Sequence, residues 1–494
     1  MESSIFFKTK KGNYYLFDSS KSTLLNIHPV LLRIRDMDNG SYTQLKNEMD
    51  NNLKEFDDGL KKRFLKKYML LKKNGFFSEI DVKERINGEI TPEIVEKQLS
   101  SVDSVLFQVT EECNLRCRYC CYGEMYEDGG YNKSLSFEAA SLILEYLVSF
   151  WASSKNLSYQ HSVRIGFYGG EPLMNFKLIK QIVDKCEELS NEYNNISMHY
   201  SMTTNGLLIS KYSDFLVAHQ FSLLISLDGN QKHSQLRTNR KGEESFDIVF
   251  SNVKKMQHTY PEYFNEKVEF NSVLNVNSSV KEIHEFIFNE FGKIPLIEVI
   301  SPTELKEDEI GLYNSIYKPY SESVEMVMAR LDRSPMYKEL GFFFYYQLNN
   351  SFKHYCEILY GTKKTKKKIP TGTCIPFFKK IYITSNGAIL PCERVGNQNV
   401  LGLIDVKSNK VNMDFAKIAK LYNNYYAIIK EQCQDCYLVE NCGQCFLQFP
   451  KRDGVPICNT KMNKEQYKDY LSYMFSLLED NKALFEEVNK MIFS

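Results

Sequence analysis

The sequence lacks an excess of charge of either sign, because its 494 residues include 62 Lys and Arg against 62 Asp and Glu. A protein built to bind nucleic acid normally carries a basic excess, so we expect no nucleic-acid partner. The first residues, from Met1 to Lys8, lack the succession of basic, apolar and small residues that forms a signal peptide. The most apolar stretch, residues 139–152, is interrupted by Glu145 and is too short to span a bilayer. We therefore expect a cytoplasmic protein with no membrane partner, in which residues 139–152 form a buried helix.

The sequence is rich in cysteine, with 13 residues of this type, most of them in two groups. Cysteines that cluster in a reducing compartment indicate a metal site or catalysis, because disulfides do not persist there. Three lie at positions 113–120, with Cys121 beside them, and seven lie between positions 374 and 458. Cys186 and Cys356 belong to neither group, and we interpret both as buried small hydrophobes.

The pattern of apolar runs and turn residues divides the chain into four parts, 1–90, 101–310, 311–370 and 371–494. Residues 1–90 predict a winged-helix-like α+β module with a hairpin around Asp18, a helix at 60–73 and a second hairpin around Asn87-Gly88. Residues 311–370 predict a helical linker, and residues 371–494 a cysteine-rich domain that ends in an amphipathic helix.

Residues 101–310 alternate short apolar strands with longer helical segments, which is typical of βα units and a parallel sheet. Six such units predict an α/β fold with a partial (β/α)6 barrel, short of the eight units of a full barrel. The predicted strands are Ser104–Thr110, Val163–Tyr168, Met198–Met202, Phe221–Leu227, Val268–Val273 and Leu296–Ile300.

The first cysteine group follows the first of these strands, with the spacing Cys113-x3-Cys117-x2-Cys120. Three thiolates on one loop can hold three irons of a [4Fe-4S] cube, which leaves the fourth iron open to an exchangeable ligand. Zinc is the alternative, but a structural zinc site needs four closed ligands. Cys121 is a poor fourth ligand, because neighbouring residues rarely chelate one ion well.

This spacing, with Tyr119 in the aromatic position, resembles the signature of radical S-adenosylmethionine (SAM) enzymes. Three further segments resemble the SAM-binding motifs of that family and come in the same order: Gly169-Gly-Glu-Pro172, Thr203-Thr-Asn-Gly206 and Ser226-Leu-Asp-Gly229. Each follows a predicted strand, at the end where parallel barrels carry their active-site loops.

The resemblance implies SAM-contacting roles for residues of these segments. Tyr119 is expected near the adenine, and Gly169 and Gly170 allow close approach of the backbone to the ligand. Glu171 is expected to accept hydrogen bonds from the SAM ammonium group, while Ser226 and Arg237 contact its carboxylate, although Arg240 lies close to Arg237. The second segment, Thr203-Thr-Asn-Gly206, contributes Thr204 and Asn205 to the same site.

The second cysteine group resembles the SPASM domain of peptide-modifying radical SAM enzymes, which implies two auxiliary [4Fe-4S] clusters. By that resemblance Cys374, Cys392 and Cys445 hold the first auxiliary cluster, and Cys433, Cys436, Cys442 and Cys458 the second. The sequence departs from the fullest pattern, because no further cysteine lies between Cys374 and Cys392 and the Cys442–Cys445 gap is one residue shorter. The first departure leaves that cluster with three thiolates and an open iron or a non-cysteine ligand. A pair of zinc ribbons is the alternative for this region.

Taken together, the resemblances imply a radical SAM peptide maturase that forms a thioether, a carbon–carbon or ether cross-link, or an epimerised residue through a 5′-deoxyadenosyl radical. They imply [4Fe-4S] clusters and SAM as cofactors, a flavodoxin- or ferredoxin-type electron donor, and a precursor peptide whose leader adds a strand to the N-terminal module. Glu393, next to Cys392, is a candidate general base, because sulfatase-maturing relatives have Asp at the comparable place. Two alternatives stay open: an anaerobic sulfatase-maturing enzyme that makes formylglycine, and a non-catalytic zinc-bound peptide-binding scaffold.

Overall fold

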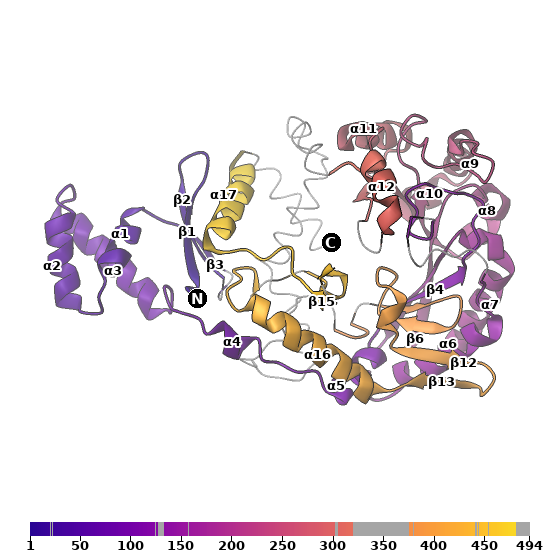
Figure 1. Cartoon of the computed structure of the whole chain (residues 1–494), viewed down its shortest axis with the longest axis horizontal. Coiled ribbons are helices and arrows are strands. Elements are labelled where there is room, and N and C mark those ends of the chain that lie inside the picture. The colour runs from indigo at the N-terminus through magenta and orange to yellow at the C-terminus, as the bar shows by residue number, and fades with distance from the viewer. Residues whose placement is uncertain are drawn as a thin grey trace. The chain divides into compact units, whose positions relative to one another are not determined.

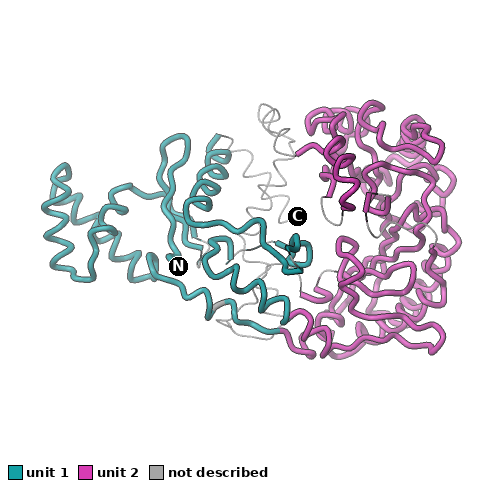
Figure 2. The backbone as a smooth tube through the Cα atoms, viewed as in Figure 1, with its two compact units in different colours: residues 1–89, 337–373, 423–494 teal, residues 90–336, 374–422 magenta. Residues whose placement is uncertain are grey.

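The computed structural model describes residues 1–319 and 375–480, apart from residues 20, 22, 124, 127–132, 157, 302–304, 379, 440, 441, 443 and 453. Contacts group the described residues into two compact units (Figure 2), one holding 1–89 and 423–480 and the other 90–319 and 375–422. The domain ranges expected from the sequence stay predictions, since compact units group residues by contact and not by function. The predicted linker and Cys356 lie outside the described residues, apart from the first residues of that range.

The first unit begins with a three-stranded antiparallel sheet in the order β1-β2-β3, followed by a group of helices (Figure 1). The side chains of Ser41 and Asp57 cap two of these helices by accepting the backbone N–H groups of Gln44 and Leu60. Apolar side chains of the sheet and the helices form one buried cluster. The elements are β1 (Ser4–Lys8), β2 (Tyr14–Asp18), β3 (Thr23–Asn26), α1 (Val30–Met37), α2 (Tyr42–Asn52), α3 (Asp58–Lys73) and α4 (Val82–Arg85).

The hairpin around Asp18 and the helix at 60–73 are therefore present, as β2 paired with β3 and as α3. The second hairpin, around Asn87-Gly88, was a wrong prediction, because the chain forms the short helix α4 there and residues 87–90 are not in a strand. The Asp81 side chain starts α4 by accepting the Glu84 N–H group at 3.3 Å. A turn dipeptide alone does not specify a hairpin, since the flanking residues must also favour strands.

The C-terminal part of the first unit combines a hairpin and a helix with β1. Helix α17 packs against β1, and the Phe475 ring lies 5.3 Å from the Phe7 ring. Helix α16 extends across the division between the units, and its 19 residues were not expected in the cysteine-rich region. The elements of this part are α16 (Phe415–Cys433), η7 (Phe446–Gln448), β14 (Lys451–Arg452), β15 (Val455–Pro456) and α17 (Lys464–Asp480).

The second unit is built on one ten-stranded sheet in the order β13-β12-β11-β10-β4-β5-β6-β7-β8-β9. The strands from β10 through β4 to β9 are parallel, whereas β10 to β13 pair antiparallel. Strands β4 to β9 agree within two residues with the six predicted strands, and they lie in sequence order. Their bounds are β4 (Ser104–Thr110), β5 (His161–Gly169), β6 (Ile196–Thr204), β7 (Ser222–Ser226), β8 (Val268–Leu274), β9 (Leu296–Val299), β10 (Ile381–Ile383), β11 (Ala388–Leu390), β12 (Gly402–Asp405) and β13 (Lys410–Met413).

Helices connect the parallel strands, as expected for crossover units (Figure 1). The apolar stretch at 139–152 forms α6, whose Ser136 cap accepts the Ala139 N–H group at 3.1 Å and whose apolar face is buried. No helix of the described chain is long and apolar enough to cross a membrane. The helices are α5 (Pro92–Ser100), α6 (Phe137–Trp151), η1 (Pro172–Asn175), α7 (Phe176–Glu192), α8 (Ile209–Ala218), α9 (Phe246–Thr259), α10 (Pro261–Lys267), α11 (Val280–Phe291), η2 (Glu307–Glu309), α12 (Ile310–Ile316) and η5 (Asn397–Asn399).

Candidate functional site

Cys113, Cys117 and Cys120 lie in the loop that leaves the carboxyl end of β4. This loop runs antiparallel to residues 236–239, because the Arg116 N–H group donates to the Thr238 carbonyl at 2.6 Å and the Arg118 N–H group to the Leu236 carbonyl at 3.0 Å. The register places Cys117 opposite Arg237. Two backbone hydrogen bonds thus fix the cysteine loop against the segment that follows β7.

The three thiols lie close enough together to influence one another electrostatically. Burial raises the pKa of Cys113 to about 11 and that of Cys117 to about 12, and the neighbouring Cys120 adds to both shifts. The Arg237 guanidinium opposes these shifts, so it favours thiolates at this place. Three partly buried thiols beside a cation are a suitable donor set for an iron–sulfur cluster.

The arrangement differs from that of a single-ion site. Among the described residues, no group of three His, Cys, Asp or Glu side chains is placed to hold one metal ion. Ligands of one ion must converge on a point, whereas the thiolates of a [4Fe-4S] cube each bind a different iron. Three thiols on one loop fit a [4Fe-4S] cube that leaves one iron open to another ligand.

The Glu171 carboxylate is fully buried and joins the ends of two strands. It accepts hydrogen bonds from the Thr204 hydroxyl at 2.8 Å and from the Asn205 backbone N–H at 2.7 Å. Through these bonds the carboxylate holds the loop after β6 against the end of β5. The contact with the SAM ammonium group that was expected of Glu171 stays a prediction, since an ionised carboxylate has further acceptor positions.

Asn205 links this loop to the cysteines. Its side-chain amide donates to the Asn114 side chain at 2.7 Å and lies 3.7 Å from the Cys113 sulfur. The motif residue Thr204 is also buried, and Ser226 is partly exposed at the end of β7. The loops after β4, β5, β6 and β7 therefore meet at one edge of the sheet, where the sequence placed them.

Gly169 and Gly170 permit a close approach of the chain to itself. A Cβ atom on Gly169 would lie 2.1 Å from the Thr110 carbonyl oxygen, and one on Gly170 would lie 2.2 Å from the Glu112 carbonyl oxygen. Gly169 also has a φ of +133°, which side-chain-bearing residues rarely adopt. Packing against the start of the cysteine loop thus requires both glycines, and the close approach to a ligand that was expected of them stays a prediction.

Tyr119 of the cysteine loop forms a hydrogen-bonded group with Asp228 and Arg237, which are buried, whereas Tyr119 is partly buried. The Tyr119 hydroxyl donates to the Asp228 carboxylate and accepts a hydrogen bond from the Arg237 Nη1 atom at 2.8 Å. Arg237 Nη1 also lies 3.8 Å from the Asp228 Oδ1 atom. From the sequence, Arg237 and Tyr119 were expected to contact SAM, and no partner was assigned to Asp228. The Asp228 carboxylate was therefore missed, although the Ser226-Leu-Asp-Gly229 motif contains it.

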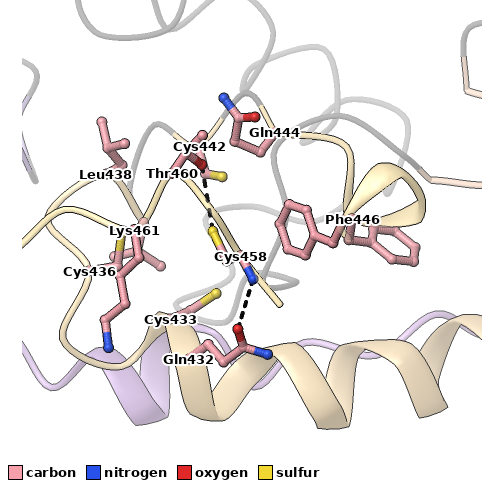
Figure 3. A pocket seen from close by; sticks show the side chains of 12 residues that line it. Gln432, Cys433, Cys436, Leu438, Cys442, Gln444, Phe446, Cys458, Thr460 and Lys461 are labelled. Carbon is pink, nitrogen blue, oxygen red and sulfur yellow. Dashed lines mark hydrogen bonds between the residues drawn. The ribbon is translucent and has the colours of Figure 1, made fainter. Parts of the chain in front are cut away.

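The predicted ligands of the second auxiliary cluster line one pocket of the first unit. Cys433, Cys436, Cys442 and Cys458 all contribute to its wall, and Figure 3 shows their sulfurs around a common space. Burial raises the pKa of Cys433 to about 12, and Cys442, Cys436 and Cys458 each add to the shift. The Gln432 side chain fixes the last ligand by accepting the Cys458 N–H group at 2.9 Å. Cys445, which was assigned to the other cluster, does not line this pocket.

The structure does not describe the three predicted ligands of the first auxiliary cluster within one unit. Cys374 lies outside the described residues, and Cys392 and Cys445 belong to different compact units. Glu393 is largely buried, and the Lys380 ammonium group donates to both of its oxygens at 3.1 Å. The ion pair occupies both oxygens of Glu393, and its role as a general base stays a prediction.

A tyrosine group near Cys121 had no local signal in the sequence. The Tyr122 and Tyr382 hydroxyls lie 3.0 Å apart, and the Tyr168 ring packs beside both rings. Cys121 is exposed and lies next to this group. Because Tyr382 lies 260 residues after Tyr122 in the chain, only the parallel pairing of β10 with β4 reveals the group.

The family model of the radical SAM superfamily matches residues 107–274, the part of the chain that carries the cysteine loop and β4 to β8. An uncharacterized protein of Methanocaldococcus jannaschii is 33% identical over 28% of this chain and 44% of that protein. The radical SAM cyclopropyl synthase TigE of Paramaledivibacter caminithermalis is 25% identical over 75% of this chain and 72% of that protein. A cysteine-type anaerobic sulfatase-maturating enzyme of Clostridium novyi is 27% identical over 40% of this chain and 49% of that enzyme.

The chain thus spans less than half the length of the first of these relatives and about half of the third. Among solved structures, native anSMEcpe with bound AdoMet and the Kp18Cys peptide has a TM-score of 0.53 and 19% identity. That match covers 78% of this chain and 99% of anSMEcpe, and at this identity it shows a shared fold. Residues 107–274 therefore match the radical SAM superfamily, a match that implies a [4Fe-4S] cluster and SAM, and the chain is distantly similar to TigE and to a sulfatase-maturating enzyme.

Proposed function

We propose that this chain is a radical SAM enzyme with auxiliary clusters that modifies a ribosomally made precursor peptide. When bound, the cluster and SAM supply the reductive cleavage that produces a 5′-deoxyadenosyl radical, chemistry that no side chain can perform. Cys113, Cys117 and Cys120 would hold that cluster, and the Glu171 bridge would fix the loops around SAM. The protein's own residues position the reacting groups and exclude water.

The observation that carries the proposal beyond the matched domain is the pocket lined by Cys433, Cys436, Cys442 and Cys458. Four thiols around one space are a full ligand set for a second cube, and they lie outside residues 107–274. Auxiliary clusters of this kind accompany peptide modification in the SPASM domains that the sequence resembles. The relation to TigE supports the same substrate class.

The N-terminal sheet supports recognition of a leader peptide. Strand β1 is covered by α17, whereas β3 pairs only with β2 among the described strands. Such an edge can accept a further strand through its backbone. Because the Ile27 N–H group donates to the Tyr14 carbonyl at 2.9 Å, the alternation of an antiparallel pair directs the Leu24 and Asn26 N–H groups away from β2.

The first test measures iron and sulfide after anaerobic reconstitution, together with SAM cleavage to 5′-deoxyadenosine. We expect about four irons per cluster, and loss of cleavage in the Cys113/Cys117/Cys120→Ala variant. Zinc in place of iron after careful reconstitution would instead favour the scaffold alternative.

The second test concerns the peptide. Peptides would be selected on the wild-type protein from a displayed library and then tested for mass change with SAM and reductant. We expect Leu24→Pro, which removes one outward N–H group at an edge position, to weaken binding of the selected peptides. Leu24→Ala keeps that N–H group and is the matched control. Equal binding by both variants, with turnover of a sulfatase-derived peptide, would favour the formylglycine alternative.

A further inference from the structure

The charged side chains beneath the cysteine loop are not accounted for by SAM binding alone. Arg237 is 5% exposed and Asp228 is fully buried, so neither charge is solvated. Burying an ion pair costs free energy unless further hydrogen bonds satisfy both partners. Here the Asp228 carboxylate also accepts the Val273 N–H group at 3.0 Å and the Tyr119 hydroxyl. The folded chain therefore satisfies the buried carboxylate of this ion pair with hydrogen bonds of its own.

The position of Arg237 relative to the cysteines is set by the backbone. The hydrogen bonds of Arg116 and Arg118 to the residues that flank Arg237 hold Arg237 opposite Cys117. Residues directly opposite one another in an antiparallel pair project their side chains to the same face, so the Arg237 cation and the Cys117 thiol lie on one side of this pairing. A cluster held by three thiolates gains one negative charge when it is reduced. A fixed cation nearby favours the reduced form more than the oxidised form.

We propose that Arg237 and Asp228 are positioning residues that set the reduction potential of the cluster at Cys113, Cys117 and Cys120, Arg237 raising it and Asp228 limiting that effect. Tyr119 lies between them and ties both to the loop, with its ring packed in the apolar group around Leu236. The inference rests on the proposed cluster at these three cysteines. It differs from the role expected of Arg237 as a contact of the SAM carboxylate, because it acts before SAM binds.

The experiment is a potentiometric titration of the reconstituted full-length protein, followed by electron paramagnetic resonance without SAM. The signal of this cluster is identified by its loss in the Cys113/Cys117/Cys120→Ala variant, which separates it from auxiliary clusters. We expect Arg237→Gln to shift the midpoint potential to a more negative value and Asp228→Asn to shift it to a more positive one. The double variant should shift to more negative values by less than Arg237→Gln alone, since it removes both charges.

Two further variants control for shape and for distant charge. Arg237→Lys keeps the positive charge and should stay near the wild-type potential. Arg240→Gln removes an exposed charge on the same segment, which water and salt screen, and should leave the potential unchanged. Iron content and circular dichroism establish that each variant folds and holds its clusters. If Arg237→Gln does not hold the cluster, the midpoint potential of Asp228→Asn tests the inference by itself, and we expect it to be more positive than that of wild type.

Unchanged potentials in both single variants, with SAM affinity lost only in Arg237→Gln, would overturn the inference and favour the role in binding the SAM carboxylate. Shifts of both variants in the same direction would also overturn it, because they would indicate a structural effect rather than one of charge. A full iron content and an unaltered signal in the triple cysteine variant would instead contradict the proposed cluster itself. The two failures are therefore distinguishable.

Discussion

The Glu171 carboxylate accepts the backbone N–H group of Asn205 at 2.7 Å, and this bond joins the end of β5 to the loop after β6. We expect Glu171→Gln to lower the free energy of unfolding by about 1–3 kcal/mol. The amide NH2 group of Gln replaces one carboxylate oxygen and cannot accept the hydrogen bonds that this oxygen accepts. SAM affinity should fall with it, as the loop loses its anchor. Anaerobic chemical denaturation and equilibrium binding of SAM measure the two effects.

Glu188→Gln is the matched control for that variant. Its side chain is 65% exposed in a surface ion pair with Lys185 and should change stability by less than about 1 kcal/mol. Equal losses in the two variants would mean that Glu171 does not hold the loop.

The four-cysteine pocket predicts a selective loss of iron. We expect Cys458→Ala to lose about four irons per chain and to keep the signal of the SAM-binding cluster, because only the pocket loses a ligand. Cys186→Ala, at a buried cysteine of α7 outside both groups, should keep all of its iron. Iron quantitation with electron paramagnetic resonance makes the comparison, and an unchanged iron content in Cys458→Ala would contradict the assignment.

The close approach at Gly170 predicts a steric effect. We expect Gly170→Ala to destabilise the protein by about 1–3 kcal/mol, because the new methyl group meets the Glu112 carbonyl oxygen and the backbone must move. Gly311→Ala introduces the same group where no heavy atom lies within 4 Å. Thermal unfolding of both reconstituted variants tests this, and a similar unfolding temperature for the two would show that the loop adapts.

Asp38 in the N-terminal module predicts a pH dependence. Partial burial raises its pKa, but hydrogen bonds from Lys72 and Tyr68 outweigh this and hold the pKa below its ordinary value of 3.8. A carboxylate with a lowered pKa stabilises the folded state above its unfolded pKa, and this stability is lost as the pH falls through the folded pKa. Asp38→Asn should therefore be less stable than wild type at pH 7, and the difference should shrink below about pH 4. Hydrogen exchange of α3 amides at several pH values measures it.

The core of the fold could be predicted from the sequence because short β-branched and aromatic runs separated by helix-length gaps allow few alternatives. The loops at the strand ends followed from that topology, which is why Glu171, Asn205 and the cysteine loop meet as expected. The partners of individual side chains could not be predicted. Whether Glu171 binds a ligand or Asn205 depends on differences of a few ångströms, and periodicity does not encode them.

The errors have particular physical causes. Asn87-Gly88 favours a turn, but Asp81 caps a helix just before it, and the helix forms instead. Helix α16 was missed although Ile418, Tyr422, Tyr426 and Ile429 are buried at helical spacing, because the cysteines around it suggested an irregular region. The pairing of Tyr122 with Tyr382 depends on the order of the strands in the sheet, and a local sequence pattern does not specify that order.

The parallel pairing of β10 with β4, in which Ile381 lies opposite Val105, also has a consequence for synthesis on the ribosome. Strand β4 emerges early, but the neighbour that completes its edge is translated about 280 residues later. At roughly 5–20 residues per second, β4 waits on the order of tens of seconds with its backbone groups unpaired on that side. The nascent chain therefore needs protection of that edge, and a chain that stops before β10 would present it permanently to other molecules.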